Sequence, residues 1–163
     1  MPEIQVSALA RKFAVEVTDD IDDLTSATWT AVNGVTDFQP QITANVQDAS
    51  DYDTNGWASS ETTMYSWTAQ VTFFRKYATS PSVTYDAGQE MIRARVGKFA
   101  PDNRIGFRWY DRNGGPEANS GVAIVDWKRS NTAVTNLEQA QVTLTGTDVP
   151  LNIDIDNPAA SAS

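Results

Sequence analysis

The chain has 163 residues, enough for one domain with a hydrophobic core, and its 21 acidic against 12 basic residues give a net charge of −9. It contains neither cysteine nor histidine, which excludes cysteine nucleophiles, histidine bases and ordinary zinc sites. The acidity disfavours tight wrapping by nucleic acid, and no apolar run is long enough to predict membrane insertion.

Alternation of apolar and polar residues with period two predicts a mainly β fold. The first strand is expected at Phe13, Val15 and Val17. An acidic run follows, and its carboxylates could in principle form a glycosidase pair, although such runs are usually solvated loops and we expect no enzymatic activity. The run consists of Asp19, Asp20, Asp22 and Asp23.

The segment from Gln47 to Glu61 is expected to be a loop between two strands. It contains D-x-D-x-N-G, the opening of a calcium-binding loop, but the twelfth position is Thr62 where such a loop needs a bidentate Glu. A turn in which Asp and Asn side chains bond their own backbone is the favoured interpretation, so no metal and no cofactor are predicted. The residues concerned are Asp51, Tyr52, Asp53, Asn55, Gly56 and Trp57.

The longest expected strand follows this loop, with one face buried and the other wet. At about twice the usual length of five to six residues, it should extend beyond a compact sandwich. Its expected buried face carries Tyr65, Trp67, Ala69, Val71 and Phe73, and its wet face carries Ser66, Thr68, Gln70 and Thr72.

One helix is expected over residues 86–99, with Asp86 capping its first amides. Its expected buried side consists of Met91, Ile92, Ala94 and Val96. Turns are expected at three Asn-Gly pairs, and the last of them should close a hairpin. These pairs are Asn33-Gly34, Asn55-Gly56 and Asn113-Gly114.

Four more strands are expected in the C-terminal half. The first alternates at Ile105, Phe107 and Trp109, and the second, residues 122–125, is apolar on both faces and should be covered on both sides. The third alternates Ala140, Val142 and Leu144 with Gln139, Gln141, Thr143 and Thr145; the fourth places Val149, Leu151, Ile153 and Ile155 on one face. The chain should form a single domain over residues 1–156, with a short flexible tail at residues 157–163.

Two motifs together resemble the major tail tube proteins of long-tailed, siphovirus-type bacteriophages, especially those of actinobacterial hosts. The first is SDYDTNGW followed by a T-x-Y-x-W-x-x-x-V strand ending in Arg75-Lys76, and the second is YDAGQEMIRAR. The resemblance extends from the amino-terminal strand to about Ile155. Where that family commonly has proline before the helix, this chain has Ala87, which affects helix initiation alone.

The resemblance implies a two-sheet β-sandwich flanked by one α-helix. Six copies would form a ring, and rings would stack into a virion tail tube that conducts double-stranded DNA without specific binding. It further implies assembly in the host cytoplasm with tape-measure, tail tip and tail terminator proteins. In this family a continuous barrel of about 24 strands lines the tube, which would give a backbone diameter of about 45 Å.

The wet faces of the long strand and of one C-terminal strand are the predicted lumen lining. A lumen lined by acidic and neutral polar side chains would repel phosphates and offer few groups that bind them. The alternative for these faces is an ordinary solvent face. They comprise Ser66, Thr68, Gln70 and Thr72, and Gln139, Gln141, Thr143 and Thr145. The loop is the element predicted to stack one hexameric ring on the next, with Tyr52 and Trp57 as anchors. The alternative is that both aromatic side chains pack on their own subunit.

Two other functions remain open. One is a monomeric carbohydrate-binding β-sandwich, for which exposed Tyr52, Trp57 and Trp109 would be stacking platforms. The other is a different virion or injection-machine component, either a tube or a head decoration protein, because related tubes share their architecture.

Overall fold

The computed structural model describes residues 13–131 and 133–160, and within them the chain is mainly antiparallel β-sheet. The strand order in the large sheet is β2-β1-β7-β8-β9-β4-β3, and β5 and β6 form a small second sheet. The elements are β1 Phe13–Thr18, β2 Thr30–Ala31, β3 Val35–Asp48, β4 Ser60–Phe74, β5 Tyr77–Ala78, β6 Thr84–Tyr85, α1 Ala87–Arg93, β7 Arg104–Asp111, β8 Ala118–Asn131 and β9 Gln139–Gly146.

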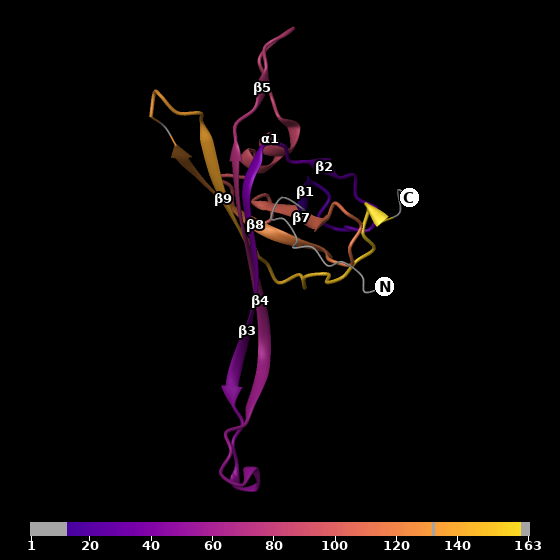
Figure 1. Cartoon of the computed structure of the whole chain (residues 1–163), viewed down its shortest axis with the longest axis vertical. Helices are drawn as coiled ribbons and strands as arrows, with labels where there is room; N and C mark the ends of the chain where they lie inside the picture. Colours follow the sequence, from indigo (N-terminus) through magenta and orange to yellow (C-terminus); the bar gives the residue numbers. More distant parts are fainter. Residues whose placement is uncertain (1–12, 132, 161–163) are drawn as a thin grey trace, which may run out of the picture.

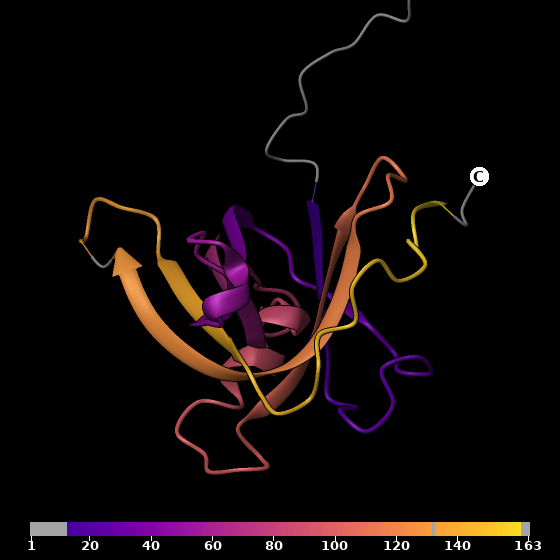
Figure 2. The same ribbon diagram turned by 90° about the horizontal axis from the view of Figure 1, so that it is seen from below.

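The large sheet folds over itself into the two layers of a sandwich, and β8 is the strand that joins them. The first half of β8 pairs with β7, up to Ile124, and the second half pairs with β9, from Ala123 onward. Figure 2 shows β8 curving through this change of partner. One layer therefore consists of β3, β4, β9 and the second half of β8, and the other consists of β2, β1, β7 and the first half of β8. This arrangement confirms the predicted β-sandwich class.

Aromatic rings fill the space between the layers. Phe38 of β3 lies 5.7 Å from Trp109 of β7, measured between ring centroids, and also contacts Phe107. Trp67 of β4 lies 5.8 Å from Trp109. Because aromatic side chains bury large apolar areas, these contacts make the junction of the two layers a major source of stability. The alternating residues predicted to be buried in β1, β7 and β9 are in this core, except Phe13, which is half-buried and packs against it. The buried ones are Val15, Val17, Ile105, Phe107, Trp109, Ala140, Val142 and Leu144.

Strand β4 is longer than predicted and has two environments. Its C-terminal half buries Trp67, Ala69, Val71 and Phe73, as predicted. Tyr65, predicted to be buried with them, is 71% exposed, because here β4 has left the body of the molecule together with β3. The two strands continue as a hairpin that projects far from the sandwich (Figure 1). The predicted extension beyond a compact sandwich is thus confirmed.

The helix is shorter than the sequence pattern predicted. Asp86 caps it as expected, since its carboxylate accepts a hydrogen bond from the backbone N–H of Gln89 at 3.2 Å. The helix ends at Arg93 with Ala94 as its C-cap, and from Arg95 onward each backbone N–H bonds the carbonyl three residues earlier, until Gly97 lies in the left-handed region at φ 77°. Ala94 and Val96 therefore lie outside the helix and are exposed, contrary to the prediction.

Two further predictions about strands are corrected. Residues 149–156 do not form a strand: Pro150 lacks an N–H and Asp154 has a φ of 52°, which leaves only an isolated bridge between Asn152 and Ser120. Residues 122–125 are buried on both faces except at Ile124, which is 40% exposed.

Turn geometry matches the predictions at all three Asn-Gly pairs, where Gly34, Gly56 and Gly114 have positive φ values. Gly34 has a φ of 82°, and Gly114, also at 82°, lies in the connection that closes the β7–β8 hairpin. Asn157, the first residue of the predicted tail, is buried, and its side-chain amide donates to the carbonyls of Asp111 and Gly115 in that connection. The packed part of the chain therefore reaches Asn157.

Candidate functional site

Two predicted polar sets lie side by side on adjacent strands. In the β4–β9 ladder, Thr68 lies opposite Thr145, Gln70 opposite Thr143 and Thr72 opposite Gln141. Phe74, at the end of β4, lies opposite Gln139. The neighbours of these residues along each strand point into the core, so the polar side chains share the outer face of the layer. Ser66, Thr68 and Thr145 are exposed, and the others are half-buried.

The same face continues onto β3, which the sequence analysis did not include. Gln39, Gln41 and Thr43 lie opposite Gln70, Thr68 and Ser66. A signal for this strand was present, because these polar residues alternate with Phe38, Pro40, Ile42 and Ala44. Pro40 argues against a central strand, but β3 is an edge strand, where a missing backbone donor is tolerated.

The second half of β8 completes the face on the other side. Asp126 lies opposite Thr143 and Lys128 opposite Gln141, and both are exposed. On β3, Asp37 lies opposite Thr72 and accepts a hydrogen bond from Gln39 at 2.6 Å. These two carboxylates and one ammonium group are set among hydroxyls and amides. We call this surface of β3, β4, β9 and the second half of β8 the polar face.

The β3–β4 hairpin ends in a loop with two exposed aromatic rings (Figure 1). Tyr52 is 106% exposed and Trp57 is 80% exposed, so neither packs on its own subunit. The loop is nevertheless ordered by its own bonds: the Asp51 carboxylate accepts from the backbone N–H of Asp53 at 3.0 Å, and Thr54 donates its hydroxyl to the Asp51 carbonyl at 2.7 Å. The loop therefore holds both aromatic side chains away from the core of the molecule, where they are accessible.

The loop geometry matches the turn interpretation of D-x-D-x-N-G. Asp51 caps a single 3-10 turn at Tyr52–Thr54, and Asn55 and Gly56 follow with φ values of 52° and 80°. Across residues 13–131 and 133–160, no group of three or more Asp, Glu, His or Cys side chains could hold a metal ion.

The acidic run after β1 uses its carboxylates within the loop. Asp23 accepts hydrogen bonds from the Thr25 hydroxyl at 2.6 Å, the Ser26 hydroxyl at 2.8 Å and the Thr25 backbone N–H at 3.0 Å. The bonds from Thr25 and Ser26 lower the pKa of Asp23 to about 2. Asp19 pairs with Arg95 at 2.6 Å. These contacts fix the loop and its connection to the segment after α1.

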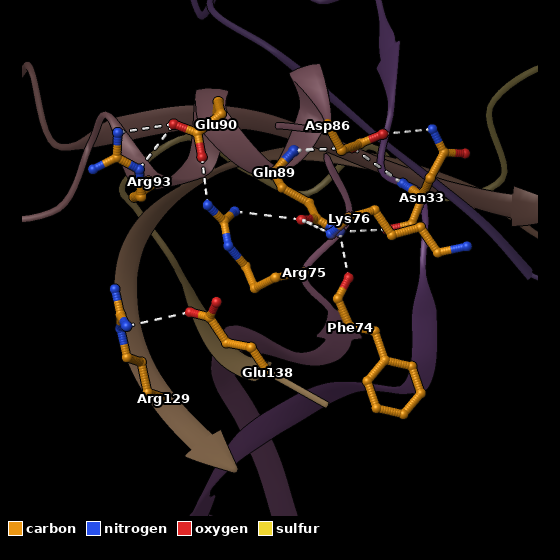
Figure 3. Close-up of polar contacts among 10 residues, drawn as sticks. All are labelled: Asn33, Phe74, Arg75, Lys76, Asp86, Gln89, Glu90, Arg93, Arg129 and Glu138. Atoms are coloured by element: carbon orange, nitrogen blue, oxygen red, sulfur yellow. Dashed lines mark hydrogen bonds and ion pairs between the residues drawn. The ribbon is translucent and has the colours of Figure 1, made fainter. Parts of the chain in front are cut away.

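A buried polar cluster attaches α1 to the ends of β3 and β4 (Figure 3). Gln89 is fully buried, and its amide nitrogen donates to the carbonyls of Asn33 at 2.7 Å and Phe74 at 2.8 Å. Its amide oxygen accepts from the backbone N–H of Lys76 at 3.4 Å and from the guanidinium of Arg75 at 3.3 Å. Every hydrogen-bonding atom of this amide has a partner, so the helix is held in one position relative to β4.

The aromatic platforms required by the carbohydrate-binding alternative are not assembled. Trp109 is only 2% exposed, because it lies between the two layers of the sandwich, so it cannot be the exposed platform that this alternative requires. Tyr52 and Trp57 remain exposed, but on the projecting loop. A groove of about 630 Å³ opens elsewhere, where β4 leaves the body, and it is lined by Ile42, Tyr65, Trp67, Val149, Leu151 and Ile153 among others.

The described part of the chain contains no helix with the length and hydrophobicity needed to span a membrane. The sequence matches no protein-family model and no curated protein. Solved structures, in contrast, match it over nearly its whole length.

A chain of the SPP1 tail tube, solved by solid-state NMR and cryo-EM, superposes with a TM-score of 0.64 at 17% identity, covering 92% of this chain and 81% of that one. A chain from the tail of an empty gene transfer agent particle, refined with C6 symmetry, superposes with a TM-score of 0.65 at 10% identity, covering 91% of this chain and 100% of that one. A chain from the sheath–tube complex of an extracellular contractile injection system superposes with a TM-score of 0.55 at 10% identity, covering 92% of this chain and 94% of that one. The chain therefore has the fold of phage tail tube proteins.

Proposed function

We propose that this chain is the major tube subunit of a siphovirus-type phage tail, in which hexameric rings stack into a conduit for DNA. The observation that carries the proposal is the polar face, a surface four strands wide that the rest of the described chain leaves uncovered. The likeness to a chain from a tail refined with C6 symmetry supports a ring of six copies.

The edges of this four-stranded layer support closure into a ring. Strand β3 is the last strand of the sheet, and its outer edge has no partner among the described strands. At the other end, β8 loses β7 as a neighbour after Ile124, so its residues 125–131 have a free edge within residues 13–131 and 133–160. An open edge favours pairing with another strand, and a heterologous contact repeated about an axis closes into a ring.

The chemistry of the polar face suits passage of DNA. Hydroxyl and amide groups predominate, and the exposed charges are Asp37, Asp126 and Lys128. Nucleic-acid affinity comes mainly from Lys and Arg that neutralise phosphates, so a lining with one ammonium group and two carboxylates per copy holds DNA weakly. The lining is then close to neutral and slightly acidic.

The proposed assembly takes place in the host cytoplasm. There the rings stack around a tape-measure protein, starting from a tail tip and ending at a terminator protein. The direct test is negative-stain electron microscopy of the purified chain across a concentration and salt series. Stacked rings with a central hole are the expected result. Dispersed particles at every concentration, including after seeding with purified tail tips, would contradict the proposal.

The tube of a contractile injection system is the second candidate, because chains of that class share the fold at TM-scores of 0.53 to 0.55. Fold alone does not separate the two uses. Seeding with tips from long, non-contractile tails separates them, since a subunit of such a tail should extend those tips and an injection-system tube should not.

A further inference from the structure

The two ends of the molecule along the hairpin direction differ in charge. We define the hairpin tip as residues 48–61, which includes the exposed rings of Tyr52 and Trp57. Between residues 33 and 74 the chain has no Lys or Arg, so nothing local neutralises the acids of the tip. These acids are Asp48, Asp51, Asp53 and Glu61, all exposed.

The opposite end is formed by β5, α1 and the end of β8 (Figure 1). We define the basic end as Lys76, Arg93 and Arg129, all of which are exposed. The side chain of Arg93 is 57% exposed and that of Arg129 is 65% exposed. Figure 3 shows Lys76, Arg93 and Arg129 around the junction of α1 with β4.

The acids near the basic end do not cancel its charge. Glu90 is shared between two guanidinium groups, with Arg75 at 2.6 Å and Arg93 at 2.8 Å. Glu138 pairs with Arg129 at 3.2 Å. Asp86 accepts hydrogen bonds from Asn33 and from the first turn of α1. One carboxylate bound by two guanidinium groups leaves a surplus of positive charge at this end.

From these features we propose that the hairpin tip of one copy docks on the basic end of a second copy in the adjacent ring. The inference rests on the proposed tube function and names the surface that receives the tip. Carboxylates form charge-assisted hydrogen bonds with guanidinium and ammonium groups, and exposed Tyr and Trp rings bind the same cations through their faces. The tip offers both kinds of group, and the basic end offers the matching cations.

The geometry agrees with a contact that propagates. The tip and the basic end lie at opposite ends of the same molecule (Figure 1), so each copy can receive one tip and donate another. A head-to-tail contact of this kind does not close on itself along the hairpin direction and therefore continues without limit. A single exposed ion pair is weak, but every subunit of a ring makes the contact at once.

Charge reversal at both surfaces tests the contact. Asp53→Lys with Glu61→Lys reverses two of the four negative charges of the tip, without touching the carboxylate of Asp51 that orders the loop. Lys76→Glu with Arg129→Glu reverses the basic end. We expect each pair to raise the critical concentration for tube formation, measured by sedimentation and electron microscopy, by about tenfold or more. All four changes together should return it to within about threefold of the wild-type value, because the two introduced ammonium groups then face the two introduced carboxylates.

Matched controls reverse exposed charges elsewhere: Asp102→Lys and Arg112→Glu should each change the critical concentration by less than about twofold. The wild-type critical concentration should also rise with salt, because exposed charges are screened over a Debye length of about 10 Å at 0.1 M. Urea unfolding establishes that each variant is folded. Where a charge-reversing substitution prevents folding, Gln at the same position is used in its place.

The outcomes separate the two proposals. Suppose that the wild-type chain forms tubes, but the critical concentration does not respond to either double substitution or does not recover in the combined variant. That result would contradict the docking surface and leave the proposed tube function intact. Failure of the wild-type chain to form tubes under any condition, seeded or not, would overturn both.

Discussion

The guanidinium of Arg75 lies 2.6 Å from the carboxylate of Glu90, and this ion pair joins the end of β4 to α1. The Arg75 side chain is only 6% exposed. Its guanidinium lies 4.4 Å from the ring centroid of Tyr85 and 5.3 Å from that of Trp127. One side chain thus contacts the helix, the small sheet and β8, which makes this position central to the stability of that end of the molecule.

Replacing Arg75 by Met should lower the free energy of unfolding by about 1–3 kcal/mol. The loss includes the ion pair, the hydrogen bond to Gln89 and the contacts with two aromatic rings. Arg75→Lys should recover only part of it, because an ammonium group cannot reproduce the planar, multidentate contacts of a guanidinium. Urea denaturation followed by Trp fluorescence measures both, and equal stabilities for Lys and Arg at this position would contradict the explanation.

Glu90 gives a prediction about pH. The hydrogen bond from Arg93, followed by the interactions with Arg75, lowers the pKa of Glu90 below its ordinary value of about 4.5, against the opposing effect of burial. A carboxyl group whose pKa is lowered by folding binds protons more weakly in the folded state. Its contribution to stability is therefore present above about pH 4.5 and is lost as the pH falls through the folded-state value.

Glu90→Gln should accordingly be less stable than the wild type at pH 7, and the difference should shrink as the pH falls below about 4.5. Denaturation at a series of pH values checks this. A difference that stays constant from pH 7 to about pH 3 would show that Glu90 acts through packing rather than charge.

Gly88 allows a prediction about whether an alanine substitution raises or lowers the free energy of unfolding. Gly→Ala in a helix normally stabilises by about 0.5–1 kcal/mol. Here a Cβ at Gly88 would overlap the backbone carbonyl of Ala31, because α1 lies against β2. Gly88→Ala should therefore destabilise by about 1–3 kcal/mol. A more stable variant in thermal or urea denaturation would show that the helix can shift away from β2 at little cost.

The sequence predicted buried faces well where one strand alternates cleanly, as in β7, β9 and the second half of β4. Alternation reports which side of a strand is apolar, but it does not report which strands are neighbours. For this reason the sequence identified the polar sets of β4 and β9 separately, whereas their adjacency depends on pairing between Thr68 and Thr145, far apart in the chain. The contribution of β3 was missed because Pro40 interrupts the pattern.

The wrong predictions arose where the sequence pattern continues but the hydrogen-bonded structure does not. Residues 149–156 alternate as a strand would, but Pro150 and the left-handed Asp154 prevent a continuous ladder. The helical pattern of residues 86–99 continues past Arg93, but the backbone turns at Gly97. Local periodicity cannot anticipate where tertiary contacts stop supporting an element.

Trp57→Ala should weaken ring stacking while leaving the subunit folded. Trp57 is 80% exposed, so its removal should change the free energy of unfolding by less than about 0.5 kcal/mol. As an anchor between rings it should raise the critical concentration by about tenfold or more, since aromatic residues dominate such contacts. Phe99→Ala, which removes a 90% exposed ring on the segment after α1, is the matched control. An unchanged threshold for Trp57→Ala would remove this residue from the stacking contact.

The position of the polar face in the lumen can be tested by labelling, because the chain has no cysteine of its own. Thr68→Cys and Gln141→Cys each place one thiol on this face, on β4 and β9 respectively. A maleimide attached to a polymer too bulky to enter a barrel with a backbone diameter of about 45 Å should modify these thiols rapidly in dissociated subunits and slowly in intact tubes. The dissociated sample is the control for intrinsic reactivity. Equal rates in both states would place the polar face on the outside of the tube, and the lining would then have to come from another surface of the subunit.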